Sequence, residues 1–128
     1  MAGLSATLVK TYIAGAAIPK RRIVKFGVSD GRVIPGAGAA VTEFLIGVTT
    51  EVDVLTGEPV DVIRSGLADV EYGGVVVRGS PLTSDATGRA VAAAPAVGVN
   101  NRIIGYAEVS AVAGDVGAAQ IVLGIFQG

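Results

Sequence analysis

The pattern of residues 23–41, IVKFGVSDGRVIPGAGAAV, recurs later in the chain in residues 81–97, PLTSDATGRAVAAAPAV. Each stretch holds a hairpin-like turn followed by a segment rich in Ala, Gly and Pro. The two stretches lie at an offset of about 60 residues, and a recurring unit of this kind is typical of an internally repeated fold.

The segments that follow each stretch also correspond. In both copies an apolar strand with one internal glycine, at Gly47 and at Gly105, precedes a closing strand. The paired segments are FLIGVTTEV at 44–52 with RIIGYAEVS at 102–110, and TGEPVDVI at 56–63 with VGAAQIVL at 116–123. The sequence therefore predicts a small β barrel or sandwich made from two pseudo-repeated strand-turn units.

The composition excludes several classes of function. The 128 residues are 51% hydrophobic but only 5% aromatic, which favours thin β layers rich in Val and Ala. The chain has no Cys and no His, so thiol catalysis, Ser-His-Asp catalysis and Cys-based zinc sites are excluded. The net charge of -1 gives no field that would attract nucleic acid or an anionic membrane. We predict no catalytic, cofactor or metal site, and hence not an enzyme.

Targeting signals are not evident near the start of the sequence. The first basic residue, Lys10, follows the apolar stretch, whereas a signal peptide begins with its basic residues. No run approaches the ~18 apolar residues of a transmembrane helix. We expect a soluble protein, either intracellular or released from a cell.

Short apolar runs, separated by Gly, Pro and Asp, predict an all-β or nearly all-β fold. Residues 65–66 are expected to form a turn, and residues 35–40 a flexible loop. Residues 1–10 are predicted to be a flexible N-terminal arm, and residues 11–128 a single β domain. The expected strands are residues 7–13, 22–28, 43–49, 60–64, 68–72, 75–78, 89–93, 102–111 and 120–126.

The charged residues leave two interpretations open. The cluster Lys20-Arg21-Arg22 is either a contact for an anionic partner or the solvated end of a strand. No aromatic residue interleaves with it, so base stacking is not expected. Asp30 and Asp85 occupy equivalent positions in the two copies and are interpreted as turn-forming residues.

One short stretch suggests an enzyme. Residues 66–74, GLADVEYGG, resemble the Asp-x-Asp-Tyr-x-Gly motif of trimeric dUTPases, whose motif residues hold the deoxyuridine. The resemblance is limited to these nine or so residues, and the other dUTPase motifs are missing. Asp69, Glu71 and Tyr72 also alternate with apolar residues as in an ordinary half-exposed strand. A dUTPase-like enzyme is therefore the lesser alternative.

A second resemblance covers nearly the whole chain. Residues 46–74, residues 77–93 (VRGSPLTSDATGRAVAA) and residues 102–123 are similar to the capsid decoration, or cement, proteins of tailed bacteriophages. The resemblance implies a structural protein on the outer capsid surface of the virion, synthesised in the host cytoplasm. Its partners would be the major capsid protein, whose adjacent subunits it clamps in the expanded shell, and itself, as a homotrimer.

We expect the protein to bind the capsid through an apolar anchor with a basic rim. Apolar side chains near the start of the chain would supply affinity, and nearby basic residues would steer binding. A glycan- or host-surface-binding module is an alternative, but the six aromatic residues are expected mostly in strand cores. The predicted capsid contacts are Leu4, Leu8, Val9, Lys10, Lys20, Arg21 and Arg22.

Overall fold

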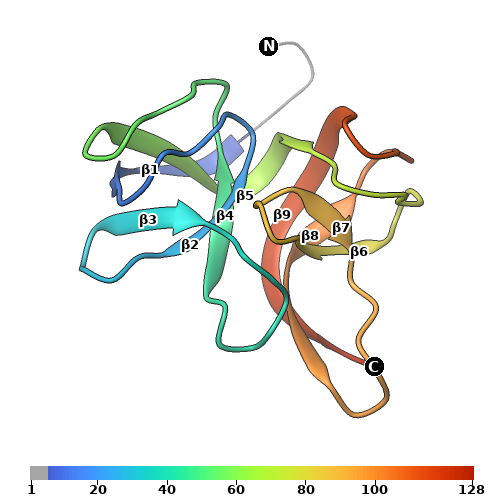
Figure 1. The fold of residues 1–128 in the computed structure, drawn as a ribbon. Coiled ribbons are helices and arrows are strands. Elements are labelled where there is room, and N and C mark those ends of the chain that lie inside the picture. Colours follow the sequence, from blue (N-terminus) through green and yellow to red (C-terminus); the bar gives the residue numbers. More distant parts are fainter. Residues whose placement is uncertain (1–5) are drawn as a thin grey trace.

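The computed structural model describes residues 6–128, which form nine β-strands and no helix. The predicted all-β class is therefore confirmed. Figure 1 shows two lobes side by side, with β5 passing through both. The strands are β1 (Ala6–Ala14), β2 (Ile23–Phe26), β3 (Arg32–Pro35), β4 (Leu45–Thr49), β5 (Pro59–Glu71), β6 (Pro81–Ser84), β7 (Ala90–Ala92), β8 (Asn100–Ala107) and β9 (Val116–Gln127).

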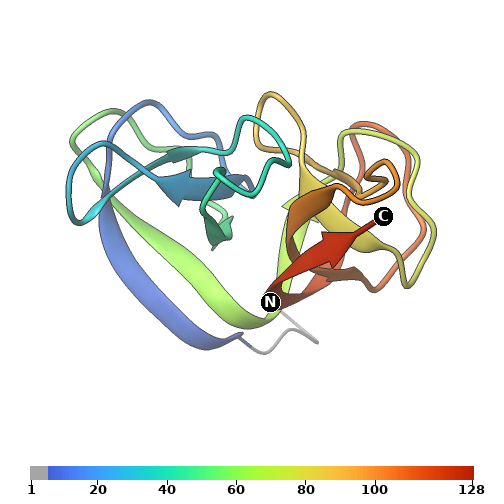
Figure 2. The ribbon, with the colours of Figure 1, turned by 90° about the horizontal axis from the view of Figure 1, so that it is seen from below.

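All nine strands belong to one mixed sheet that closes on itself twice. The order is β1-β3-β2-β4-β5-β9-β8-β6-β7, and β1 also pairs with β5, which closes a first barrel. A parallel bridge between Tyr72, which follows β5, and Ala90 of β7 pairs these two strands and closes a second barrel. Seen from below in Figure 2, these are the two lobes, and β5 is the last strand of one and the first strand of the other.

The predicted internal repeat is confirmed by the strand pairing. The hairpin β2–β3 corresponds to β6–β7, β4 corresponds to β8, and β5 corresponds to β9. Individual hydrogen bonds repeat as well. The Ala14 N–H donates to the Glu58 carbonyl at 2.9 Å, and one repeat later the Tyr72 N–H donates to the Asp115 carbonyl at 2.7 Å.

Three expectations about strands were wrong. The predicted turn at residues 65–66 is a continuous part of β5, because Gly66 has a φ of +98° and bends the strand while it changes partner. At this residue β5 pairs with both Ala6 of β1 and Ile121 of β9. Residues 75–78 form no strand and contribute one isolated bridge, between Val76 and Ala111. The short strands β3 and β6 were not predicted as separate strands.

Two apolar cores lie on either side of β4. All five residues of this strand are buried. Ile46 packs in the first core, whereas Leu45 and Val48, on either side of a register shift against β2, pack in the second. The first core also contains Tyr12, Ala14, Ile18, Val24, Val33, Val54, Val60 and Val62. The second is built around Ala68, Val70, Tyr72, Leu82, Ala90, Ile104, Ala107, Ala119 and Ile121.

The predicted N-terminal arm overlaps β1. Residues 6–10 belong to this strand, in which Val9 pairs with Ile63 and Lys10 pairs with Val62 of β5. Residues 1–5 lie outside the described part of the chain. The boundary drawn between residues 10 and 11 thus falls inside a strand.

Candidate functional site

Three of the predicted capsid contacts, Leu8, Val9 and Lys10, lie in β1 and are exposed. The side chains of Leu8 and Val9 are 53% and 47% exposed. The register of β1 on β5 shifts twice at this end, between Ala6 and Leu8 and between Leu8 and Val9. The Lys10 ammonium lies 5.0 Å from the centre of the Tyr12 ring. Leu4 falls outside the described residues.

The basic cluster Lys20-Arg21-Arg22 is mostly engaged with carboxylates of the same chain. Arg21 Nη2 lies 3.1 Å from Glu51 Oε1, and Arg22 Nη2 lies 3.4 Å from Glu71 Oε1. The side chains of both arginines are largely buried, whereas Lys20 is exposed. This arrangement favours a structural role for the two arginines over a basic rim.

Arg22 belongs to a network of charges where the two barrels meet. It donates from Nη1 to the Thr87 carbonyl at 3.0 Å. Glu71 lies between two guanidinium groups, 3.4 Å from Arg22 and 3.5 Å from Arg89. Arg89 Nε in turn lies 3.4 Å from Asp85 Oδ2. Since these residues come from the segment before β2, the end of β5 and the β6–β7 turn, the network ties the first barrel to the second.

Asp85 holds the β6–β7 turn, as the sequence predicted. Its carboxylate accepts hydrogen bonds from the N–H groups of Thr87 and Arg89, both at 2.9 Å. Burial alone would raise the pKa of Asp85, but these hydrogen bonds outweigh it and hold the pKa below its ordinary value. Glu43 behaves similarly, because the hydrogen bond from Lys25 Nζ, at 2.9 Å, lowers the pKa of its carboxyl.

We expect these two carboxylates to make the fold sensitive to acid. Their pKa values are lower in the folded than in the unfolded chain, so they stabilise the fold fully above about pH 4. That contribution is lost as the pH falls toward and through the folded-state pKa values. Urea unfolding at pH 7 and at pH 3 should give a lower midpoint at pH 3, and Asp85→Asn should reduce the difference. Equal midpoints at both pH values would contradict this.

The residues that resemble a dUTPase motif have structural partners. The ring of Tyr72 is fully buried, and its hydroxyl donates to the Ala118 carbonyl at 3.0 Å. Burial raises the pKa of Tyr72 to about 12. Glu71 is held by two arginines. Among residues 6–128, no group of three or more acidic residues is arranged to hold a metal ion. That the chain is not an enzyme stays a prediction.

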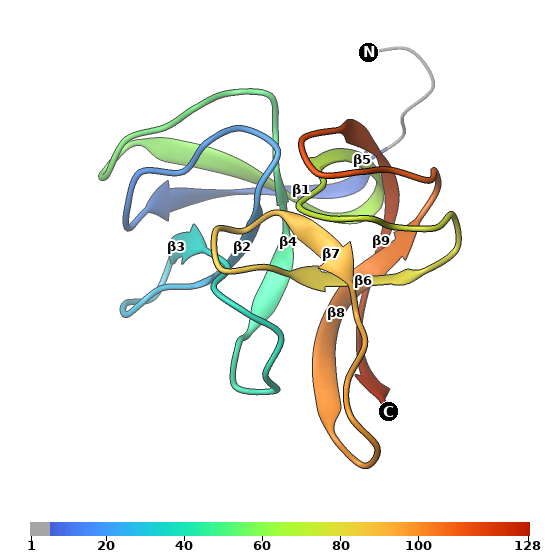
Figure 3. The same cartoon turned by 45° about the vertical axis from the view of Figure 1, so that its right-hand side comes forward.

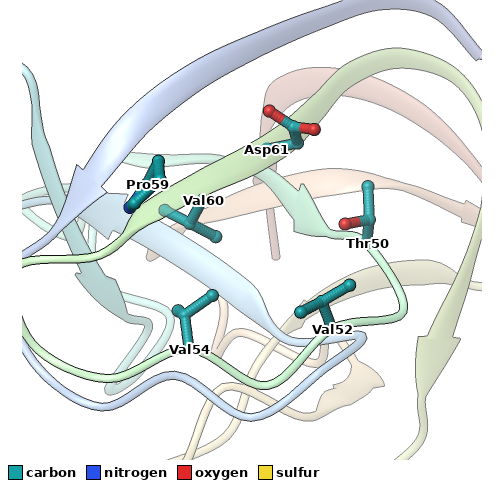
Figure 4. Close-up of a pocket in the computed structure, with 6 residues that line it drawn as sticks. All are labelled: Thr50, Val52, Val54, Pro59, Val60 and Asp61. Carbon is teal, nitrogen blue, oxygen red and sulfur yellow. The ribbon is translucent and has the colours of Figure 1, made fainter.

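The surface has two shallow hollows next to the segment after β4. One, of about 260 Å³, is lined by valines from this segment and from β5 (Figure 4). The Asp61 carboxylate points away from Val52 and Val54 in that view, and it accepts a hydrogen bond from Thr11 Oγ1. The second, of about 270 Å³, lies beside Ile63 and Asp69. Both are below the usual size of ligand pockets, about 300–1,000 Å³. The part of the chain that the structure describes contains no helix suited to crossing a bilayer.

The expectation that the aromatic residues lie mostly in the cores was wrong. Only Tyr12 and Tyr72 are buried. Four rings are between 38% and 52% exposed, and one of them, Phe44, lies 4.9 Å from the Arg102 guanidinium. The exposed rings are those of Phe26, Phe44, Tyr106 and Phe126. The expected burial of the aromatic residues was the argument against a glycan- or host-surface-binding module, and that argument therefore does not hold.

An exposed apolar element that the sequence reasoning missed lies at the end of β9. We name it the β8–β9 ribbon, meaning residues 100–103 of β8 with residues 122–127 of β9. Figure 3 shows it projecting from the two barrels toward the C-terminus. Its exposed large apolar side chains are Val122, Leu123, Ile125 and Phe126. The uncharged run IVLGIF at 121–126 was the available signal, but it was assigned to an ordinary strand.

The fold of this chain is found in a solved phage structure. The crystal structure of the N base of the head fiber gp8.5 in bacteriophage phi29 matches with a TM-score of 0.62. The match covers 90% of this chain and 93% of the other, at 20% sequence identity. No protein-family model matches the sequence, and no curated protein matches it.

The match is long enough to include both barrels of this chain. A match over 90% of the chain includes strands of both barrels, and it accounts for almost the whole of the phi29 domain. The two-barrel fold described above is therefore also the fold of that head fiber base.

Proposed function

We propose that this protein is a capsid decoration protein, which binds the outer surface of a tailed-phage head and clamps adjacent major capsid subunits. The observation that carries the proposal is the fold shared with the N base of a phage head fiber over 90% of the chain. The resemblance of residues 46–74, 77–93 and 102–123 to phage decoration proteins supports it independently. The proposed role is structural and involves no catalysis.

β1 is the surface that we assign to the capsid. Within the described residues this strand pairs with β3 only at Ile13 and Ala14, so the rest of that edge is free for another strand. Strand addition supplies backbone hydrogen bonds, while Leu8 and Val9 supply apolar contact. Burying these two side chains would contribute about 3–6 kcal/mol before ordering costs.

A homotrimer is part of the proposal. Each trimer would present three copies of β1 to the capsid lattice, and binding of the first copy raises the effective concentration of the others. A modest interface per copy, on the order of 1,000–2,000 Å², then suffices for stable attachment.

Co-sedimentation with capsids tests the proposed function. We expect the protein to sediment with expanded capsids and to saturate at a fixed number of copies per shell, with weaker or no binding to unexpanded capsids. Bound protein should also raise the temperature at which expanded capsids disrupt. Failure to bind either form of capsid would contradict the proposal.

The Leu8→Asp, Val9→Asp double variant is expected to weaken capsid binding more than tenfold, because it removes the apolar contact and adds two charges to the docking strand. Circular dichroism should remain that of the wild type, since both positions are exposed in the free protein. Val28→Asp is the matched control, because Val28 is fully exposed in the β2–β3 turn. Wild-type occupancy of the double variant at limiting concentration would show that β1 is not the contact.

A further inference from the structure

We propose that Asp30 and Gly31, in the β2–β3 turn, form a site of covalent self-modification, at which the Asp30 carboxyl and the Gly31 backbone nitrogen close a succinimide ring that hydrolyses to isoaspartate. Asp30 is the only aspartate of the sequence that is followed by glycine. Glycine has no side chain beside the attacking nitrogen, so it hinders this ring closure least. The inference does not depend on the proposed capsid role.

The reaction needs only the chain and water. The Gly31 nitrogen forms a bond to Cγ of Asp30 and gives up its proton, while the protonated carboxyl gives up its hydroxyl, so one water molecule leaves. Water then opens the ring at one of its two carbonyls. Opening at Cγ restores aspartate, whereas opening at the backbone carbonyl breaks the original peptide bond and leaves the chain running through Cβ and Cγ. The water that is taken up balances the water that was lost.

Both reacting groups are exposed and free of other contacts. Residues 28–32 are all exposed, and in Figures 1 and 2 their turn lies at the outer edge of the first barrel. Within residues 6–128, the Asp30 carboxylate accepts no hydrogen bond and makes no ion pair, and the Gly31 N–H donates no hydrogen bond. The bond that closes the turn runs from the Arg32 N–H to the Ser29 carbonyl at 3.2 Å and leaves both groups unused.

The backbone of the turn also leaves room for the ring. Gly31 has a φ of +76°, and a Cβ built there would meet no atom within 4 Å. Exposed turn tips of this kind are the places where a folded chain changes its local conformation most readily. The side chain of Asp30 can therefore turn onto the next nitrogen without disturbing a packed neighbour.

The corresponding β6–β7 turn shows what protects an aspartate from this reaction. The Asp85 carboxylate accepts hydrogen bonds from the N–H groups of Thr87 and Arg89 at 2.9 Å and from the Thr87 hydroxyl at 3.1 Å. A carboxylate held in this way is not free to turn onto the nitrogen of Ala86. The glycine of that turn, Gly88, has a φ of +84° but follows a threonine, which has no carboxyl. The two turns therefore differ at the groups that ring closure requires.

Isoaspartate would weaken the pairing that closes the first barrel. The Gly31 carbonyl accepts a hydrogen bond from the Ile13 N–H at 2.9 Å. In the described part of the chain, β1 pairs with β3 only at Ile13 and Ala14, directly beside this bond. An isoaspartate adds one atom to the main chain of the turn and so displaces the Gly31 carbonyl. We expect the modified protein to unfold at a lower urea concentration than the unmodified protein.

Incubation in water enriched in oxygen-18 tests the site, because each ring opening adds one labelled oxygen. Folded protein is kept at physiological temperature and mildly acidic pH and then digested with trypsin in ordinary water. Cleavage at Lys and Arg gives one peptide for each turn, residues 26–32 and residues 79–89. The first should gain label at least about tenfold faster than the second, whose carboxylate is held by hydrogen bonds. Electron-based fragmentation should locate isoaspartate at residue 30. A first peptide labelled no faster than the second would overturn the proposal.

Two variants separate the sequence of the turn from its structure. Asp30→Glu keeps the charge but would need a six-membered ring, so it should gain no label in this peptide. Ala86→Gly gives the second turn the same aspartate-glycine sequence while Asp85 keeps its hydrogen bonds, so its label should stay low. Labelling of the Ala86→Gly variant as fast as that of the wild-type β2–β3 turn would contradict the role given to the free Asp30 carboxylate.

Urea unfolding of aged protein tests the structural consequence. The isoaspartate form is separated from the unmodified form by ion exchange, and its midpoint should be the lower of the two. Asp30→Glu protein aged in the same way should keep its midpoint. Equal midpoints of the two wild-type forms would show that the hydrogen bond from Ile13 survives the modification, and would overturn this consequence. Neither experiment uses capsids, so their outcome is independent of the co-sedimentation test.

Discussion

Gly105→Ala is expected to lower the free energy of unfolding by at least about 3 kcal/mol. Gly105 has a φ of +146°, in a region that residues with a Cβ rarely adopt. A Cβ at this position would also overlap the backbone carbonyl of Gln120 on β9. Relief would require β8 and β9 to separate, yet their pairing holds one wall of the second barrel. Since small domains are stable by only about 5–15 kcal/mol, much of the variant should unfold in mild denaturant.

Urea unfolding followed by circular dichroism measures this effect. Gly38→Ala is the matched control, because a Cβ there would meet no atom within 4 Å, and it should change the midpoint little. Gly47→Ala should resemble Gly105→Ala, since Gly47 occupies the equivalent position in β4 and its Cβ would overlap the Ile63 carbonyl. A Gly105→Ala variant as stable as Gly38→Ala would show that β8 can move away without cost.

Tyr72→Ala is expected to cost about 3–5 kcal/mol, the usual range for removing a large buried aromatic side chain. Tyr72 is fully buried, and it is the largest side chain in the second core. The corresponding residue in the first barrel is Ala14, so only the second barrel has a large ring at this position. The cavity would lie directly beneath the Tyr72–Ala90 bridge that closes this barrel.

Tyr72→Phe separates the ring from the hydroxyl. It keeps the ring but leaves the Ala118 carbonyl without the hydroxyl that donates to it, so a loss of about 1 kcal/mol is expected. Thermal and urea unfolding of both variants should therefore rank wild type above Tyr72→Phe and Tyr72→Phe well above Tyr72→Ala. Equal stability of the two variants would mean that the hydroxyl, and not the packed ring, carries the contribution.

Much of the fold was predictable because turn-forming residues recur at equivalent positions in the two halves of the sequence. The Gly-Arg turns and the single strand glycines, Gly47 and Gly105, fall at equivalent positions and led directly to the two units. The continuity of β5 was not predictable, because Ser65-Gly66 has the composition of a turn. A strand that changes partner needs the same bend that a turn needs, and local sequence does not distinguish the two.

The candidate site was less predictable than the fold. Leu8 and Val9 were identified from their position near the start of the chain, and the structure places them on an exposed strand. The arginines of the basic cluster were not recognised as internal partners, because Glu51 and Glu71 are distant in sequence. The ribbon was missed because an apolar run in a strand predicts that its side chains are buried, whereas the structure leaves most of them exposed.

The sharing of β5 between the barrels means that no single cut between them leaves both barrels complete. A cut before Pro59 removes the last strand of the first barrel, and a cut in residues 73–80 leaves the second barrel without its first strand. Either cut therefore leaves only one barrel complete, because the other barrel has lost β5, although the sequence looks like two tandem modules. If the two units arose by duplication, a single cut could keep either barrel complete, but it could not yield both, because both need the one strand that they share.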